Sequence, residues 1–375
     1  MVHVPYDKSI SPSGFPVHEG VASPAIVVDL DRVERNIARM ASLTASRGAT
    51  IRPHAKTHKS RRIAMKQLAA GAVGLTVATL SEAAAFVEAG IEDVFVAYPV
   101  WPAGVKQNMV RWLAANTRRL RLGVDSTAGA ELVGAVAKGR EARVEMMIEI
   151  DCGGGRSGVR TPAESLSIAR AVDAAGLSLA GIFTHGGHSY AGADTVRAAA
   201  SDEVRSLAMH AETLRSQGFE VAELSAGSSP TSIRDDRLIV TEERPGTYVF
   251  NDRWQVTLES CSWDDVALSV QSTVVSVASD HVVLDAGAKV LSTDLPPVLR
   301  GYGHLPAYPE AEVSRLYDHH AILTSGGGPL PSLGEAVIVV PNHVCPVVNL
   351  ADDFVAVASS EIIGRWPVDG RGLVI

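Results

Sequence analysis

The strongest constraint on the fold is an alternation of short β-rich runs with longer helical patterns, which continues unbroken from Pro24 to about Phe250. About eight such units in one run favour a (β/α)8 barrel of the TIM type over a doubly wound sheet. In such barrels the chemistry lies at the C-terminal ends of the strands. The expected strands are Ala25–Val28, Thr50–His54, Gly74–Ala78, Val94–Tyr98, Leu120–Val124, Val144–Asp151, Leu179–Thr184 and Glu223–Ala226.

Capping signals agree with the helical stretches of this alternation. Polar residues suited to N-caps precede the stretches, and glycines follow them. The expected N-caps are Asp31, Ser81, Thr127 and Thr161, and the expected terminating glycines are Gly90, Gly176 and Gly218.

The chain changes character after Trp254, where valine-rich alternating runs are separated by loops rich in Pro and Gly. This pattern predicts a separate β domain. We therefore expect an α/β protein in which residues 24–253 form the barrel and residues 1–23 and 254–375 form the β domain. The expected β-domain strands are Ser269–Ser276, His281–Asp285, Ala336–Val340 and Phe354–Ala358.

Composition excludes several classes of function. The formal net charge is −8, from 34 basic and 42 acidic residues, and there is no basic run. Binding to nucleic acid or to an anionic membrane surface is therefore not expected. The three cysteines cannot form a disulfide framework, and no apolar stretch approaches the length of a membrane span. We expect a soluble, cytoplasmic enzyme.

A dense group of cations follows the second expected strand, in the segment Arg52-Pro53-His54-Ala55-Lys56-Thr57-His58-Lys59. Burial and neighbouring positive charge would both lower the pKa of a lysine there, toward the neutral nucleophile that a Schiff base requires. The alternative is that these are solvated charges at the start of the next helix.

The segment Ser225-Ala226-Gly227-Ser228-Ser229-Pro230-Thr231 ends a late strand. Small residues there let successive backbone N–H groups converge on an anion, and late barrel loops commonly bind phosphate. By itself the segment could be a simple Gly/Ser turn. Combined with a lysine at a strand end, it points to pyridoxal phosphate.

His343 and Cys345 are separated by one residue. If they lie on a strand, their side chains point to the same face and can bind one metal ion. The alternative is a chance pair, because zinc sites usually have three or four protein ligands.

Taken in order, the motifs of this chain resemble those of the fold-type III pyridoxal phosphate enzymes related to alanine racemase. The group concerned contains D-serine dehydratase and D-threonine aldolase, and the resemblance covers nearly the whole chain. The supporting segments are Ser23–Ala25, Asp29–Asp31, Arg52–Lys59, Asp151–Gly158, Thr184–Gly187, Ser225–Thr231, Pro245–Tyr248, Asp285–Gly287 and Pro341–Pro346.

The resemblance implies roles for individual residues. Lys56 would bind the cofactor as a Schiff base and act as a catalytic residue, with Lys59 as its neighbour. Arg156 would lie beside the pyridine ring, and His185 would be a second catalytic residue near the cofactor and the metal. The remaining cofactor-binding residues would be Thr184, Tyr190, Gly227, Ser228, Ser229 and Tyr248.

The resemblance also implies a divalent metal bound by His343 and Cys345. A thiolate ligand favours Zn²⁺ over Mn²⁺ or Mg²⁺. Cysteine at the second position resembles the dehydratases, whereas the aldolases typically have aspartate there. One departure concerns Asp318-His319-His320, which stands where the family usually shows an acidic pair before the histidine. This change affects either the substrate or a dimer contact.

The implied function is that of a lyase acting on a small D-β-hydroxy-α-amino acid, by β-elimination of the D-serine dehydratase type to a 2-oxo acid and ammonia. The alternatives are retro-aldol cleavage of the D-threonine aldolase type, or D-3-hydroxyaspartate as the substrate. A pyridoxal phosphate homeostasis protein without turnover and an alanine racemase are further alternatives. The family also implies a homodimer with shared active sites.

Overall fold

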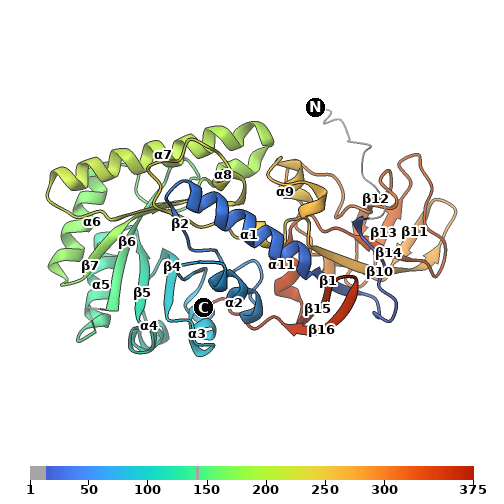
Figure 1. The fold of residues 1–375 in the computed structure, drawn as a ribbon, viewed down its shortest axis with the longest axis horizontal. Helices are drawn as coiled ribbons and strands as arrows, with labels where there is room; N and C mark the ends of the chain where they lie inside the picture. The colour runs from blue at the N-terminus through green and yellow to red at the C-terminus, as the bar shows by residue number, and fades with distance from the viewer. Residues whose placement is uncertain (1–13, 141–142) are drawn as a thin grey trace. The chain divides into compact units, whose positions relative to one another are not determined.

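The computed structural model describes residues 14–140 and 143–375, and their contacts divide them into two compact units (Figure 1). The first, called here the barrel unit, comprises Asn36–Val249 and Val368–Ile375. The second, called here the β unit, comprises Phe250–Pro367 and the described residues up to Arg35. The first 13 residues, which the predicted β domain includes, lie outside the described part.

The barrel unit contains a parallel eight-stranded sheet in the order β2-β9-β8-β7-β6-β5-β4-β3. An isolated parallel bridge between His54 and Thr76 joins its two ends, so the predicted barrel is confirmed. The strands are β2 (Thr50–Ile51), β3 (Leu75–Val77), β4 (Asp93–Pro99), β5 (Arg119–Val124), β6 (Val144–Ile150), β7 (Ser178–Thr184), β8 (Glu223–Ala226) and β9 (Glu242–Glu243).

Helices follow most of these strands and bury their apolar faces against a continuous aliphatic core. They are α1 (Leu30–Ser46), α2 (Arg61–Ala69), α3 (Leu80–Glu88), α4 (Val105–Asn116), α5 (Thr127–Ala137), α6 (Pro162–Ala174), α7 (Ala193–Ser216) and α8 (Ser229–Ser232), with 3₁₀ turns η3 (Gly187–Ala191) and η4 (Thr247–Val249).

The N-cap predictions are only partly confirmed. Thr161 forms a full capping box with Glu164, as predicted. The caps of α5 and α3 are Ser126 and Thr79, each earlier than the predicted Thr127 and Ser81. A capping oxygen must stand before the first turn to accept a backbone N–H two or three residues later, which explains the shift.

The first expected barrel strand is placed differently from the prediction. β1 (Ala25–Asp29) belongs to the sheet of the β unit, where it pairs with β10 and β15. Ala25 and Val27 pack there against Val355 and Val357. The eighth barrel strand is instead β9, which the sequence pattern did not indicate. By contacts, the division between the units falls at Arg35, within α1.

The β unit has a sheet in the order β12-β13-β11-β10-β1-β15-β16, with β14 paired to β10. The four valine-rich strands expected after Trp254 are confirmed, and β12, β13 and β16 are additional. The elements are β10 (Leu268–Val277), β11 (His281–Leu284), β12 (Glu312–Leu316), β13 (Ala321–Thr324), β14 (Ala336–Val339), β15 (Asp353–Ala358), β16 (Glu361–Pro367), α9 (Arg253–Thr257), η5 (Trp263–Asp265), α10 (Ala288–Leu291) and α11 (Val344–Leu350).

The barrel interior has an ionic layer and an aromatic layer. Buried Glu242 accepts hydrogen bonds from Arg52 at 2.7 Å and from Arg121 at 3.0 Å. Phe95 and Phe183 meet edge to face, with ring centroids 5.0 Å apart, in a cluster with Met147.

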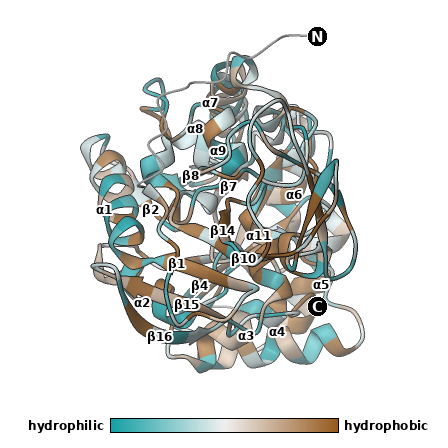
Figure 2. Ribbon diagram, turned by 90° about the vertical axis from the view of Figure 1, so that its right-hand side faces the viewer, coloured by the Kyte–Doolittle hydropathy of each residue, from teal (hydrophilic) through white to brown (hydrophobic). Residues whose placement is uncertain are grey.

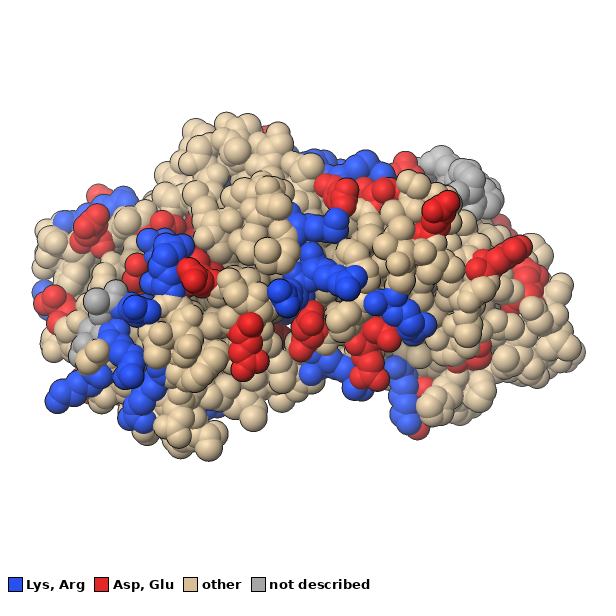
Figure 3. Space-filling model, turned by 60° about the horizontal axis from the view of Figure 1, so that its bottom comes forward, with Lys and Arg blue, Asp and Glu red and all other residues tan. Residues whose placement is uncertain are grey.

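The strands are largely apolar and the helices carry polar residues among apolar ones, as the hydropathy colours show (Figure 2). Basic and acidic side chains are interspersed on the face shown in Figure 3. Within the described ranges, none of the helices combines the length and the apolar character that crossing a bilayer requires.

Candidate active site and metal centre

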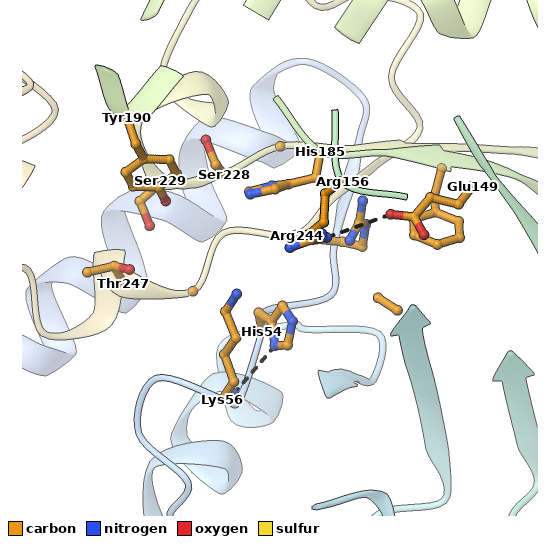
Figure 4. A pocket seen from close by; sticks show the side chains of 14 residues that line it. His54, Lys56, Glu149, Arg156, His185, Tyr190, Ser228, Ser229, Arg244 and Thr247 are labelled. Atoms are coloured by element: carbon orange, nitrogen blue, oxygen red, sulfur yellow. Dashed lines mark hydrogen bonds and ion pairs between the residues drawn. The ribbon is translucent and has the colours of Figure 1, made fainter. Parts of the chain in front are cut away.

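A pocket opens in the barrel unit where its strands end, as expected for a barrel. Figure 4 shows Lys56 with its amine directed toward the space flanked by His185, Ser229 and Thr247. Seven of the predicted site residues line this pocket together. The lining residues are His54, Lys56, Ala97, Glu149, Arg156, Phe183, His185, Tyr190, Gly227, Ser228, Ser229, Arg244, Gly246 and Thr247.

Lys56 lies in a tight turn after β2, next to a buried histidine. Its backbone N–H donates to Nδ1 of His54 at 3.4 Å, so the proton of a neutral His54 ring is on Nε2. Burial, and then the positive charges of Lys56 and Arg244, hold the pKa of His54 well below its usual range. The ring therefore stays neutral beside the lysine.

Lys59 has a different environment. It is buried, its backbone has a positive φ of 46°, and its amine forms an ion pair with Glu82 at 3.1 Å. It is not among the pocket residues within the described chain. Its amine is therefore engaged by a carboxylate in the structure.

His185 follows β7 and faces the same pocket. Burial, and then the charges of Lys56 and Arg244, keep its pKa well below the usual value, so it is a neutral imidazole at physiological pH. The next residue, Gly186, donates its N–H to buried Glu203 at 2.7 Å, which fixes the turn. The rings of His185 and Tyr190 lie 6.3 Å apart.

The loop after β8 has a conformation that requires glycine. Gly227 has φ of 98°, and a Cβ placed there would lie 2.1 Å from Oε2 of Glu243. Ser228 caps the short helix α8, while Oγ of Ser229 accepts the N–H of Tyr248 at 2.8 Å. Close packing thus holds two serine hydroxyls at the pocket wall, where a phosphate fits.

The base of the pocket contains Arg244, which the sequence analysis did not select. Its Nε donates to Ser225 at 2.8 Å, and its Nη2 donates to the carbonyl of Thr184. The guanidinium stands 5.1 Å from the ring centroid of Phe183. Burial lowers the pKa of Arg244. Its only sequence signal is the charged run before Pro245-Gly246.

Arg156 and Glu149 form a pair at the opposite wall (Figure 4). Nη2 of Arg156 lies 3.7 Å from Oε1 of Glu149, and the arginine side chain is 66% exposed. Burial raises the pKa of Glu149. Arg156 was predicted from the family resemblance, whereas Glu149, an inconspicuous residue of β6, was not predicted.

Thr184 and Tyr248 stand outside the described pocket lining. The hydroxyl of Thr184 donates to the carbonyl of Ile150 at 2.7 Å. The hydroxyl of Tyr248 accepts from Gln67 at 3.0 Å, and its pKa is raised by burial. The backbone N–H of Tyr248 donates to Ser229, and the carbonyl of Thr184 accepts from Arg244. Both residues therefore support side chains that line the pocket.

His343 and Cys345 do not lie on a strand, so that expectation is wrong. His343 is the N-cap of α11, and Cys345 is the second residue of this helix. Buried Asp252 stabilises the helix start by accepting the N–H of Val344 at 3.0 Å. Pro346 is tolerated in the first helical turn because no intrahelical donor is lost there. The imidazole and the thiol nevertheless interact, since Cys345 is one of the groups that raise the pKa of His343.

The surroundings of His343 are anionic. Burial lowers the pKa of His343, but Cys345 and the carboxylate of Asp294 outweigh burial and raise it to about 11. Burial raises the pKa of Asp252 to about 6. One nitrogen and one sulfur donor in an anionic setting fit Zn²⁺. In the described residues, no group of three or more His, Cys, Asp or Glu side chains could hold a metal ion.

The segment Asp318-His319-His320 lies in an exposed turn of the β unit. Asp318 pairs with Lys289 at 3.4 Å. The turn packs closely on Gly287, where a Cβ would lie 2.3 Å from the backbone nitrogen of His320. The turn conformation is therefore well defined, although its residues depart from the family pattern.

Two family models match this chain. "Alanine racemase, N-terminal domain" matches residues 28–253, and "Putative serine dehydratase domain" matches residues 267–357. A D-threo-3-hydroxyaspartate dehydratase from Delftia sp. (strain HT23) is 35% identical over 372 residues, which cover 92% of this chain and 96% of the relative. A D-threonine aldolase from Arthrobacter sp. is 30% identical over 364 residues, covering 94% and 93%.

Solved structures agree with these matches. The Delftia dehydratase has a TM-score of 0.86 and 34% identity, covering 93% of this chain and 98% of its own. A D-threonine aldolase from Filomicrobium marinum has a TM-score of 0.85 and 30% identity, covering 95% and 97%. Variants of the same dehydratase were solved with alanine replacing a histidine and with alanine replacing a cysteine two positions further on, the latter in a metal-free form.

Proposed function

Because this chain belongs to the alanine racemase-like, fold-type III family of pyridoxal phosphate enzymes, we propose that it is a lyase acting on D-β-hydroxy-α-amino acids. The observation that carries this proposal is the gathering of Lys56, two neutral histidines and the Gly227–Ser229 loop around one pocket. The second family model and the relatives named above, dehydratases and aldolases, support it.

The pocket residues fit pyridoxal phosphate. Lys56 would bind its aldehyde carbon, the Gly227–Ser229 loop would hold its phosphate, and Arg156 would lie beside its ring. When bound, the cofactor withdraws electrons from the substrate α-carbon and thereby makes the α-proton acidic. The buried Arg244, fixed over Phe95 and Phe183, adds a permanent positive charge at the pocket base.

Lys56 is the group best placed to take the α-proton of the substrate. Burial and nearby cations keep His54 and His185 neutral. Neither ring therefore carries a positive charge beside Lys56. A neutral His185 can also accept a proton from a hydroxyl group. These side chains therefore support general base chemistry at the α-carbon.

We infer that His343 and Cys345 hold Zn²⁺, which would supply Lewis-acid assistance to the departure of the substrate β-hydroxyl. A solved relative whose cysteine-to-alanine variant is metal-free, with a histidine two positions before that cysteine, supports this assignment. Mn²⁺ and Mg²⁺ are less suited to a thiolate ligand.

The proposed reaction is β-elimination to a 2-oxo acid and ammonia, as in D-serine dehydratase. The thiolate in the metal pair and the dehydratase relative at 35% identity favour elimination over retro-aldol cleavage. That relative also makes D-threo-3-hydroxyaspartate a substrate to test beside D-serine. A D-threonine aldolase at 30% identity keeps cleavage to glycine and an aldehyde as the second candidate.

Product identification tests the function directly. The holoenzyme with Zn²⁺ is incubated with D-serine, D-threonine and D-3-hydroxyaspartate, and the products are separated by chromatography. A 2-oxo acid and ammonia in equal amounts are expected. Glycine with an aldehyde would establish the aldolase alternative, and racemised substrate alone would establish an alanine racemase.

A further inference from the structure

Asp294 contacts His343, one of the two proposed metal ligands, and the residue before it, Asn342; all three lie in the β unit. Its Oδ2 lies 2.6 Å from Nδ1 of His343. Its backbone carbonyl accepts from Nδ2 of Asn342 at 3.4 Å. The loop after α10 and the segment before α11 are thus joined by both the main chain and the side chain of Asp294.

The first contact determines which ring nitrogen is available. A histidine must be in its neutral form to bind a metal ion. A neutral imidazole that donates its Nδ1–H to a carboxylate carries its lone pair on Nε2. Metal-binding histidines commonly use this arrangement, in which the carboxylate fixes the orientation of the ring and makes its other nitrogen a better ligand.

Two further contacts restrict the His343 ring. Trp254 packs against it edge to face, with the ring centroids 5.5 Å apart. Asp252 holds the backbone of the following residue, Val344. These two contacts restrict the ring plane and the backbone. The hydrogen bond with the Asp294 carboxylate is made at Nδ1, so this contact assigns Nδ1 to the protein and leaves Nε2 for the ion.

We propose that Asp294 is the positioning residue of the metal centre: it binds Nδ1 of His343 and so directs Nε2 to the ion. The inference rests on the proposed metal centre and adds to it a residue that the HxC motif does not contain. Asp294 acts through His343 and is not itself a ligand.

The test compares Zn²⁺ affinity among variants of the full-length, pyridoxal phosphate-loaded protein, by competition with a chromophoric chelator. Asp294→Ala should weaken Zn²⁺ binding by about 10- to 100-fold. Asp294→Asn should fall between the wild type and Asp294→Ala, since its amide oxygen still accepts from Nδ1 but carries no charge. The matched control is Asp280→Asn, because Asp280 also pairs with a histidine, His281, at 2.8 Å, on an exposed turn of the same unit.

The variant His343→Ala distinguishes failure of the proposed metal centre from failure of the role proposed for Asp294. If His343→Ala binds Zn²⁺ as tightly as the wild type, the proposed metal centre is wrong, and this inference fails with it. If His343→Ala loses Zn²⁺ while Asp294→Ala keeps full affinity, the metal centre stands and the role of Asp294 is overturned.

The same variants distinguish positioning by Asp294 from two other roles, stabilisation of the fold and direct binding of the ion. Asp294→Ala should fold, because the main-chain contact with Asn342 does not need the carboxylate. Equal losses of affinity in Asp294→Asn and Asp294→Ala, with lower unfolding midpoints in the metal-free proteins, would overturn positioning in favour of fold stability. With Co²⁺ at saturation, the visible spectrum of Asp294→Ala should match the wild type, whereas bands that indicate a lost ligand would show that Asp294 binds the ion itself.

Discussion

At the scale of single residues, two lysines three positions apart have opposite environments. Lys56 points into the pocket, whereas Lys59 is paired with Glu82. We therefore expect Lys56→Ala to lose both the visible imine absorbance of the purified protein and its turnover. Lys59→Ala should keep the imine absorbance. Absorbance spectra of the two variants check this. Imine absorbance retained in Lys56→Ala but lost in Lys59→Ala would mean that Lys59 binds the cofactor and Lys56 does not.

The proposed metal ligands, His343 and Cys345, allow a second prediction. Removal of Zn²⁺ leaves Lys56 and the cofactor in place, so exchange of the substrate α-proton with solvent should continue in part. Loss of the hydroxyl should slow by on the order of a thousandfold, since metal assistance contributes several kcal/mol and ~1.4 kcal/mol is tenfold in rate.

The measurement compares EDTA-treated wild type with His343→Ala, following deuterium exchange and 2-oxo acid formation in parallel. Added Zn²⁺ should restore 2-oxo acid formation in the wild type and not in His343→Ala. Undiminished 2-oxo acid formation in protein shown to contain negligible metal would contradict the role of the ion.

His58 gives a pH prediction for stability. Burial lowers its pKa from 6.5 to about 4, while its Nδ1 accepts from the N–H of Ser60 at 3.1 Å. Between these two pH values the unfolded chain binds a proton at His58 that the folded chain does not. The contribution of His58 is therefore complete above pH 6.5 and is lost as the pH falls toward 4, at up to ~1.4 kcal/mol per pH unit.

Urea unfolding at several pH values checks this. His58→Asn, whose amide oxygen can still accept from Ser60, should reduce the dependence of the free energy of unfolding on pH between 6 and 5 by up to about one proton. An unchanged slope in this variant would assign the acid sensitivity to other groups.

At the scale of elements, the Gly227–Ser229 loop, which we propose holds the cofactor phosphate, depends on one glycine. A methyl group at Gly227 would meet both Glu243 and Ser232, at 2.1 and 2.3 Å, and a positive φ is itself costly for alanine. Gly227→Ala should therefore shift the loop and weaken cofactor binding by about 5- to 150-fold, because overpacking typically costs about 1–3 kcal/mol.

Gly218 is the matched control for this substitution. It also has a positive φ, of 86°, but nothing lies within 4 Å of the added Cβ. Gly218→Ala should lower the unfolding midpoint without changing cofactor affinity, which titration of the cofactor-free protein with pyridoxal phosphate measures. Equal effects of the two substitutions on affinity would show that the loop packing is not important.

Elements with a clear hydrophobic signal were predictable from the sequence. β4 to β8 are runs of apolar residues at regular spacing, and each was placed within a few residues of its observed bounds. β9 could not be predicted, because it consists of two glutamates whose burial depends on Arg52, Arg121 and Arg237, which are distant in sequence or lie in a loop. β1 was placed in the wrong sheet because a short apolar run fits either sheet.

The same distinction holds for the site. Lys56, His185 and Ser228 belong to dense local motifs, so the sequence analysis found them. Arg244 follows directly after β9, and its position became evident only once that strand was known. The helical start at His343 could not be predicted from the HxC pair, because it depends on capping by Asp252, which lies far away in sequence.

At the scale of the whole molecule, we propose that the protein is a homodimer with active sites shared between subunits, as the family resemblance implies. A mixture of two inactive variants, Lys56→Ala and His343→Ala, refolded together should recover part of the activity, because mixed dimers would contain one intact site. Each variant refolded alone should remain inactive.

Sedimentation and activity measurements check the dimer together. A fully active monomer at micromolar concentration would contradict it, as would a dimer in which the mixed variants recover no activity.

The closure of the barrel by β9 has a consequence for the order of folding. Glu242 meets Arg52 across 190 positions of the chain, and the two ends of a loop of that length come together slowly. Until they do, the edges of β2 and β8 stay unpaired, and Glu242 and Glu243 cannot be desolvated without their arginines. The nascent protein is therefore expected to pass through an open, edge-exposed sheet that is prone to aggregation, and the cell must synthesise residue 243 before this state can end.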